Sequence, residues 1–271
     1  MAYETILYET GDQIATITLN RPSKMNAFTS KMGYEIGQAM IRADDDPNVR
    51  VIIMTGAGDK AFCAGADLGG FARDIKKREG ESVEGEFSGG GGRATLALPI
   101  LMRDLSKPTI AAINGFCLGV GFTMTLPFDV RVASENARMG AIFARVGLIS
   151  ELGSSFLLPR LIGVSRAAEM MLTGKQYSPQ EALAMGLISG IAPAGQVMAK
   201  ARELAGEMLQ CSPFSLALTK KALYQGIHTN IESAMQFEGF ALEKCYVSAE
   251  HKEYVTAFME KRKPDFSKVR S

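Results

Sequence analysis

The sequence contains little of what several common kinds of site require. It has no tryptophan, two histidines and four cysteines in 271 residues. His228 and His251 both lie in the C-terminal third among charged and polar neighbours, which does not favour a histidine-based metal site or a Ser-His-Asp triad. The cysteines are far apart and never form a C-x-x-C pair, so neither a disulfide framework nor a zinc ribbon is indicated. We expect no metal, and we expect the four cysteines to be packing residues: Cys63, Cys117, Cys211 and Cys245.

An excess of charge and a long apolar run are also missing. Thirty Lys and Arg residues against 29 Asp and Glu give a net charge of +1, so electrostatics favours neither nucleic acid nor an anionic membrane as a partner. No stretch of about 18 apolar residues can span a bilayer, and the first residues lack the basic and apolar regions of a secretory signal. We therefore expect a soluble, cytoplasmic protein.

What the sequence does contain is typical of a packed α/β protein. Hydrophobic residues make up 46% of it, which indicates one large domain or a core with a small appendage. Strand-like runs alternate with helical patterns in the first half, where Thr29 can cap a helix with apolar residues at positions 32, 36, 39, 40 and 43. The expected strands cover residues 13–19, 49–54, 108–113 and 129–133, and a further helix is expected at 119–126.

The chain becomes almost wholly helical in pattern from residue 165 onward. Ser178-Pro-Gln-Glu181 is a capping box with proline at the first helical position. We expect a core over residues 1–195 and a helical C-terminal region over residues 196–271. The helices of that region are expected at 196–210, 213–225, 231–246 and 250–260.

Residues 72–93 differ from their surroundings. A charged stretch is followed by four consecutive glycines, and such a segment cannot order itself by apolar burial. A plain flexible loop is the simpler interpretation, and a lid over a site is the alternative. The glycines do not form a phosphate loop, because no Gly-Lys-Ser or Gly-Lys-Thr follows them.

Glycine-rich turns are the candidates for a binding site, but they do not fit a dinucleotide. Gly56-Ala-Gly58 and Gly119-Val-Gly121 both lack the third glycine of a dinucleotide fingerprint, which argues against a nicotinamide or flavin cofactor. Two segments, 61–68 and 114–121, remain as candidates. The small residues in 61–68 and 114–121 would let a ligand approach the backbone closely. Backbone N–H groups at such turns can hold an anion or a developing oxyanion, although close packing of a strand on a helix explains the same pattern.

Seven segments, in their order and spacing along nearly the whole chain, resemble the crotonase superfamily, also called the enoyl-CoA hydratase/isomerase family. They are Ile17-Thr-Leu-Asn-Arg-Pro22, Asn26-Ala27, Ala61-Phe-Cys-Ala-Gly-Ala-Asp67-Leu68, Asn114-Gly115, Gly119-Val-Gly121, Leu158-Pro-Arg-Leu161 and Ala257-Phe-Met-Glu-Lys-Arg-Lys-Pro264. The resemblance implies an α/β spiral of ββα units that form two roughly perpendicular sheets. It also implies a helical C-terminal region that builds homotrimers or hexamers, and an acyl-CoA thioester as substrate, with no cofactor beyond the coenzyme A of that substrate.

The resemblance also implies which residues act. The two backbone donors of an oxyanion hole, which would stabilise an enolate, fall on Ala66 and Val120. Glycine is usual at the second position, but a valine keeps the main-chain donor. Positions that match coenzyme A contacts, beside those two, are Lys24, Met25, Ala64, Asp67 and Leu68, together with Phe258 and Lys261 from the end helix, which in many relatives belongs to a neighbouring subunit.

Carboxylates decide the reaction in this family. Hydratases use two glutamates, and the matching positions here hold Thr123 and Phe143. The well-placed acid is Glu151, at a position that resembles the catalytic acid of some 3,2-enoyl-CoA isomerases. We expect Glu151 to move a proton and to have a pKa raised by its neighbours Leu148, Ile149, Leu152 and Phe156.

Other interpretations stay open at this point. Glu151 can instead cap a helix, or pair with Arg145 and so become a weaker base. The chain can be a hydratase, a ring-epoxide-type acyl-CoA isomerase or, less well matched, a dehalogenase. From a different class, it can be a non-catalytic protein of this fold that binds acyl-CoA.

Overall fold

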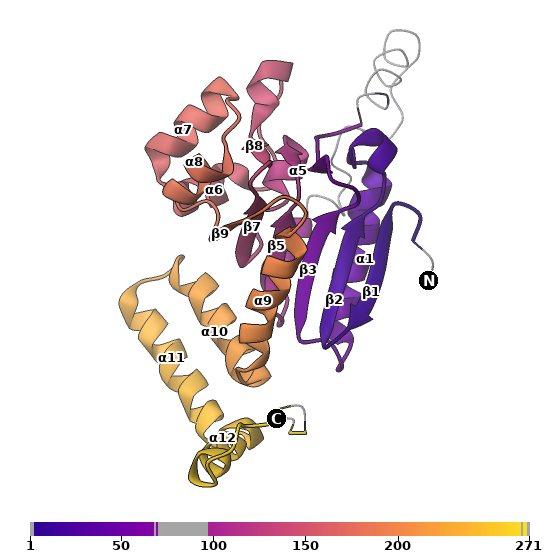
Figure 1. The fold of residues 1–271 in the computed structure, drawn as a ribbon. Coiled ribbons are helices and arrows are strands. Elements are labelled where there is room, and N and C mark those ends of the chain that lie inside the picture. Colours follow the sequence, from indigo (N-terminus) through magenta and orange to yellow (C-terminus); the bar gives the residue numbers. More distant parts are fainter. Residues whose placement is uncertain (1–2, 68, 70–96, 267, 270–271) are drawn as a thin grey trace, which may run out of the picture.

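A computed structural model describes residues 3–67, 69, 97–266 and 268–269 (Figure 1). The segment 72–93 and Leu68 lie outside these ranges. The strands form two sheets, as expected. The larger has the order β1-β2-β3-β5-β7-β9, formed by Ile6–Gly11, Ile14–Leu19, Val51–Gly56, Thr109–Ile113, Val130–Ser134 and Gly190–Ala192. The smaller has the order β4-β6-β8, formed by Ala61–Cys63, Phe116–Leu118 and Arg138–Gly140.

The larger sheet is buried on both faces. Its first pair is antiparallel and the remaining pairs are parallel, and every residue of β3 and β5 is buried, as is usual for parallel strands between two layers. Helix α1 (Ser30–Asp45) covers one face and α9 (Val197–Leu209) the other (Figure 1). The predicted boundary at residue 195 stays a prediction, and α9, just beyond it, packs on the core sheet.

Caps and periodicity explain the helices that the sequence indicates best. The Thr29 hydroxyl accepts a hydrogen bond from the Met32 amide at 3.1 Å, and the five apolar positions predicted to be buried in α1 are buried. Ser178 and Glu181 form the reciprocal capping box that begins α8 (Pro179–Ala184). The other helices and 3-10 turns are η1 (Pro22–Lys24), α4 (Leu98–Asp104), α5 (Val120–Thr123), η2 (Ile142–Val146), α6 (Ser154–Ile162), α7 (Val164–Thr173), α10 (Pro213–Gly226), α11 (Ile231–Tyr246) and α12 (Ala249–Met259).

Two expectations of secondary structure need correction. The helix expected at 119–126 is the short α5, preceded by strand β6. The C-terminal third is not wholly helical, because β9 adds an edge strand to the larger sheet. Both differences come from three-residue strands, which are too short to show any periodicity in the sequence.

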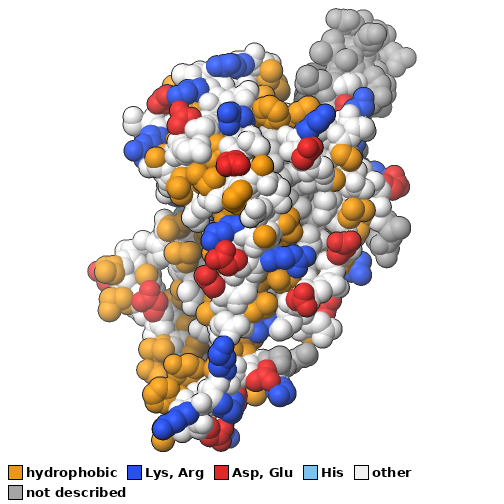
Figure 2. Space-filling view, in the orientation of Figure 1, with side chains coloured by type: hydrophobic (Ala, Val, Ile, Leu, Met, Phe, Trp, Pro, Cys, Tyr) orange, Lys and Arg blue, Asp and Glu red, His pale blue; other side chains and the backbone are white. Residues whose placement is uncertain are grey.

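The last three helices extend away from the sheets, and α12 lies at the far end (Figure 1). They carry much exposed apolar surface, visible at the lower left of Figure 2. Ala241 is the one buried residue of α11 in this single chain. Large exposed side chains here are Leu223, Ile231, Met235, Phe240, Leu242, Tyr246, Val247, Tyr254, Phe258 and Met259. A surface of this kind is typical of a protein interface.

Candidate functional site

The loop over residues 20–28 packs beside the turn that follows β4. The Ala64 amide donates to the Met25 carbonyl at 3.1 Å, and the Phe28 amide donates to the Gly65 carbonyl at 2.8 Å. Asn26 is fully buried, and its side-chain amide donates to the carbonyls of Ala57 and Ala61 at 3.0 and 2.8 Å. These bonds hold the segment that carries Lys24 and Met25 against the segment that carries Ala64 and Asp67.

The same place has a defined charge pattern. Arg21 and Asp67 form an ion pair at 2.7 Å, and the hydrogen bond from Arg21 is the main cause that lowers the pKa of the Asp67 carboxyl. Lys24 is exposed and makes no ion pair within the described residues, and Met25 is 37% exposed. The loop therefore presents a free ammonium group and an apolar side chain at the surface.

Two backbone amides meet between this loop and α5. Phe28 and Ala66 form a parallel bridge that uses the Gly65 carbonyl and the Asp67 amide, so the Ala66 amide points away from Phe28. Val120 is the first residue of α5 and follows Gly119, whose φ is +55°. A Cβ atom on Gly119 would lie 3.9 Å from the Gly65 Cα atom, so the two turns are in contact.

Neither the Ala66 amide nor the Val120 amide donates a hydrogen bond within the part of the chain that the structure describes. The glycines of these turns permit the close approach. A Cβ atom on Gly121 would lie 2.2 Å from the Cys63 carbonyl oxygen, which no side chain can occupy. Two unsatisfied donors from two adjoining turns are the arrangement that binds an oxyanion.

The positions of the two hydratase glutamates hold no acid. Thr123 is fully buried, and its hydroxyl lies 3.4 Å from the carbonyls of Gly119 and Val120. Phe143 is buried in the core. Neither side chain can take a proton at neutral pH. These two positions therefore cannot support the hydratase mechanism that uses both glutamates.

Glu151 is a half-buried carboxylate without a partner. Within the described residues its side chain makes no hydrogen bond or ion pair, and burial raises its pKa. The capping alternative is wrong, because Gly153 is the N-cap of α6 and the Ser154 amide donates to the Glu151 main-chain oxygen. Pairing with Arg145 is wrong as well, because no ion pair or hydrogen bond joins the two side chains, and burial is the cause of the shift in the Glu151 pKa.

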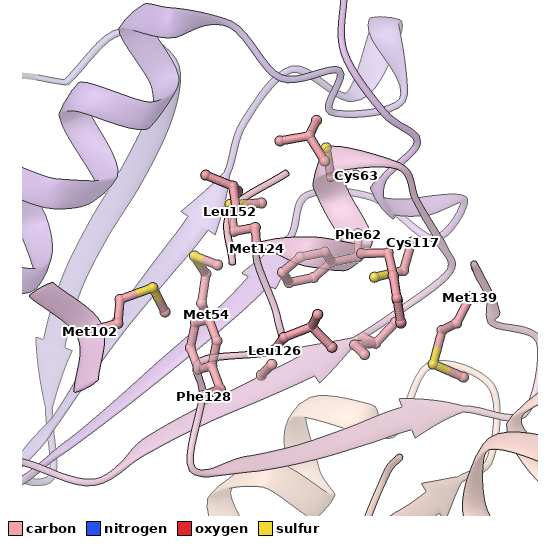
Figure 3. Packing of buried hydrophobic residues seen from close by; sticks show 14 of the residues in the cluster. Met54, Phe62, Cys63, Met102, Cys117, Met124, Leu126, Phe128, Met139 and Leu152 are labelled. Carbon is pink, nitrogen blue, oxygen red and sulfur yellow. The ribbon is translucent and has the colours of Figure 1, made fainter. Parts of the chain in front are cut away.

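Of the four side chains expected to shield the carboxylate, Leu152 is buried and Phe156 is partly buried, but the other two are exposed. Leu148 and Ile149 are 51% and 89% exposed, so they do not shield the carboxylate. Leu152 is buried, with φ at +55°, and belongs to the same packed cluster as Val120 and Met124 (Figure 3). Ala66 packs against that cluster too. The segment that carries Glu151 is therefore anchored in the core through Leu152.

Phe258 and Lys261 are not brought to the site within one chain. They lie on and just beyond α12, at the opposite end of the molecule from η1, and Phe258 is 71% exposed (Figure 1). Leu68 lies outside the described residues. The structure thus groups Lys24, Met25, Ala64, Ala66, Asp67 and Val120, and leaves the end helix free to reach another copy.

The cysteines divide into two kinds. Cys63 and Cys117 are buried partners on β4 and β6, and burial raises the pKa of the Cys63 thiol to about 11. Cys211 is exposed and Cys245 is intermediate, so the expectation that all four pack in the core is wrong for Cys211. The structure describes no cluster of three or more residues suited to a metal ion, and none of its helices is long and apolar enough to cross a bilayer.

Sequence reasoning missed one feature, a cavity of about 990 Å³ that adjoins Gly153. Its walls come from α4, α6, α10 and α11, and the first two are far in sequence from the last two. The charged and aromatic lining residues include Arg103, Tyr224 and His228. No local motif could have shown that Arg103 meets the other two, because it lies on α4, more than 100 residues before Tyr224 and His228.

Comparison with known proteins identifies the family. A model described as enoyl-CoA hydratase/isomerase matches residues 9–269 of the chain. The chain belongs to the enoyl-CoA hydratase/isomerase family. It is 34% identical to the crotonyl-CoA hydratase of Syntrophomonas wolfei, over 98% of this chain and 99% of that protein. It is also 34% identical to the carnitinyl-CoA dehydratase of Proteus mirabilis, over 95% of this chain and 96% of that protein.

A solved structure agrees with this family assignment. The enoyl-CoA hydratase of Bacillus anthracis superposes with a TM-score of 0.85 at 33% identity, over 97% of this chain and 99% of that chain. The crotonase fold expected from the sequence is therefore confirmed. As a member of the enoyl-CoA hydratase/isomerase family, the protein is an enzyme that acts on acyl-CoA thioesters.

Proposed function

We propose that the enzyme shifts a double bond, from 3-enoyl-CoA to 2-enoyl-CoA, with Glu151 as the proton shuttle. The observation that carries this proposal is a half-buried Glu151 that has a raised pKa and no partner among the described residues, while Thr123 and Phe143 replace the two glutamates of hydratases. A carboxylate of this kind suits proton transfer at neutral pH.

The reaction needs one base and one oxyanion site. The Glu151 carboxylate takes a proton from the carbon next to the thioester, and the electron pair moves onto the thioester oxygen. The amides of Ala66 and Val120 donate hydrogen bonds to the dienolate that forms. Glu151 then returns the same proton at the γ-carbon, which leaves the double bond conjugated with the thioester and restores the carboxylate. Loss of one such donor typically costs about 3 to 4 kcal/mol of transition-state stabilisation.

Coenzyme A would lie along the loop described above. Lys24 would pair with a phosphate, and Met25, Ala64, Asp67 and Leu68 would line the path of the adenine and pantetheine. Phe258 and Lys261 would come from a neighbouring subunit of a homotrimer, because within one chain they lie at the far end of the molecule.

A second candidate is hydration of a 2-enoyl-CoA. The relatives favour it, since those compared above are named hydratases or a dehydratase. In that case Glu151 would activate water or protonate the α-carbon. Two further possibilities are isomerisation of a ring epoxide and binding of acyl-CoA without catalysis. Failure to convert either enoyl-CoA in the same experiment would favour one of these.

The test is an assay of a short 3-enoyl-CoA and of its 2-enoyl isomer, with separation of the products by chromatography beside 3-hydroxyacyl-CoA standards. The wild type is compared with Glu151→Gln and with a control, Glu203→Gln, which removes an exposed carboxylate on α9. We expect isomerisation to fall by two or more orders of magnitude in Glu151→Gln alone. A hydrated product as the main product would support the second candidate. Binding without turnover by the wild type would overturn catalysis altogether.

A further inference from the structure

The cavity beside Gly153 has mainly apolar walls. Gly153 and Phe156, which line it, follow Glu151 closely in the chain, so the segment that carries the proposed catalytic acid also forms part of the cavity wall. Other apolar lining residues are Ile100, Leu105, Leu157, Leu218 and Phe237. A volume of about 990 Å³ lies at the upper end of the usual range for small-molecule sites.

One cation in this cavity has no acid to balance it. The Arg103 guanidinium stacks on Tyr224, with its carbon 4.7 Å from the ring centroid, and its Nη2 atom lies 2.9 Å from His228 Nε2. Its Nε atom is buried without a hydrogen-bond partner, and Arg103 makes no ion pair with any residue that the structure describes. Asp104 also lines the cavity, but it does not pair with Arg103.

The partly buried acid beside Tyr224 already has partners. Asp129 accepts from the Lys220 ammonium at 2.9 Å and from the Tyr224 hydroxyl at 2.7 Å, so both of its oxygens have partners. The pair of Lys220 and Asp129 shows how this part of the fold balances a buried cation. Arg103, which is partly buried and stacks on the ring of Tyr224, has no acidic partner among the described residues.

His228 holds Arg103 in place without neutralising it. The His228 ring stacks on the Phe156 ring, with 4.9 Å between the centroids. The guanidinium carbon of Arg160 also lies over the Phe156 ring, 3.5 Å from its centroid. Desolvation, followed by the charges of Arg103 and Arg160, lowers the pKa of His228. A neutral imidazole accepts a hydrogen bond from the guanidinium and adds no negative charge. Lys221 and Arg160 add further positive charge around the cavity.

We propose that this cavity binds the distal carboxylate of an acyl chain, so that the preferred substrates are enoyl-CoA thioesters of dicarboxylic acids, with Arg103 as the specificity-determining residue. The inference rests on the proposed function of the neighbouring site. An apolar passage with an unpaired guanidinium matches a methylene chain that ends in an anion. A methyl-terminated chain would leave that cation without a partner and would displace its water, which costs free energy.

The test uses two pairs of ligands of equal chain length, one member ending in a methyl group and the other in a carboxylate. The first pair is enoyl-CoA, for which kcat/KM is measured. The second pair is saturated acyl-CoA, which cannot react, and its Kd is measured by calorimetry. We expect the wild type to favour the carboxylate in both pairs by on the order of 10- to 100-fold. Arg103→Met should lose this preference while it retains or gains activity on the methyl-terminated substrate.

Two further variants keep the result decisive. Arg103→Lys should retain part of the preference, and Arg166→Met, which removes an exposed cation on α7, should leave it unchanged. Equal wild-type Kd values for the two saturated ligands, or an equal loss on both substrates in a folded Arg103→Met, would overturn the subsite. A carboxylate preference in binding, without turnover of either enoyl-CoA, would support the subsite and refute the proposed reaction instead.

Discussion

At the scale of single residues, Glu151 combines two properties that oppose each other. Burial without a partner disfavours its ionised form, and this raises its pKa and makes it a better base. The same burial destabilises the folded protein whenever the carboxyl is ionised. A residue that costs stability and has no structural partner is typical of a functional site.

The pH dependence of stability gives a prediction for Glu151. Since its pKa is raised in the folded state, the protonated carboxyl favours folding below the ordinary glutamate pKa, and this contribution is lost as the pH rises through the raised value. Glutamine is neutral throughout. Glu151→Gln should therefore unfold at a higher temperature than the wild type at pH 8, with a smaller difference near pH 4.

Thermal unfolding of both proteins across this pH range is the measurement, and Glu203→Gln is the control because Glu203 is exposed. The wild-type kcat/KM should also fall as the pH drops through the raised pKa of Glu151, since the base must be ionised. A Glu151→Gln variant that is less stable at pH 8 would contradict the assignment of an unpaired, desolvated carboxylate.

Sequence reasoning pointed to this residue and to part of its environment. The lack of an acid at positions 123 and 143 is readable directly, and it points to Glu151. Of the four residues expected to shield it, Leu152 is buried and Phe156 is partly buried, but Leu148 and Ile149 are exposed, because the chain turns after η2 in a way that no periodic pattern encodes. Arg103 was not predicted at all, since the residues that surround its guanidinium lie more than 100 residues away in the sequence.

At the scale of elements, α10 is held to the core by a small polar network. The Lys220 ammonium donates to the Lys107 carbonyl and to Asp129, both at 2.9 Å, and Asp129 also accepts from the Thr109 amide at 2.7 Å. Lys220 is buried, and its two bonds join α10 to the segments before β5 and β7, which the Thr109 bond joins to each other. Breaking a buried ion pair by removal of one partner leaves the other charge uncompensated.

Lys220→Met should therefore destabilise the protein by about 3 kcal/mol or more. Lys221→Met is the matched control, because the neighbouring lysine is exposed and makes no ion pair within the described ranges. Denaturant unfolding of both variants measures the difference. Equal stability of the two variants would mean that the network does not hold α10.

Elements differ in how well the sequence predicts them, and the reason is length and capping. The bounds of α11 match the prediction, and the start of α1 follows its Thr29 cap. The three strands of the smaller sheet have three residues each, so neither alternation nor composition marks them. Their positions follow from glycines that let the turns approach, which is tertiary information.

At the scale of the whole molecule, a single chain is incomplete in two respects. The helices α10 to α12 expose a large apolar surface, and Phe258 and Lys261 lie far from the loop they were expected to assist (Figures 1 and 2). A second copy resolves both, because it would cover the apolar surface and would place its own α12 near the loop of its neighbour. These two features favour an assembly of several copies, and the homotrimer or hexamer that the resemblance implies remains a prediction.

Subunit mixing tests this arrangement through function. Glu151→Gln lacks the proposed catalytic acid but keeps an intact α12. A double variant, Phe258→Ala with Lys261→Ala, keeps the catalytic acid but lacks the proposed coenzyme A contacts of the end helix. If each site combines the core of one subunit with α12 of another, some sites of a mixed assembly are intact on both sides. Unfolding and refolding the two inactive or weakened proteins together should then yield more activity than the sum of the two refolded separately. Sedimentation analysis checks that mixed assemblies form. No gain in such assemblies would mean that α12 serves the core of its own chain or takes no part in the site.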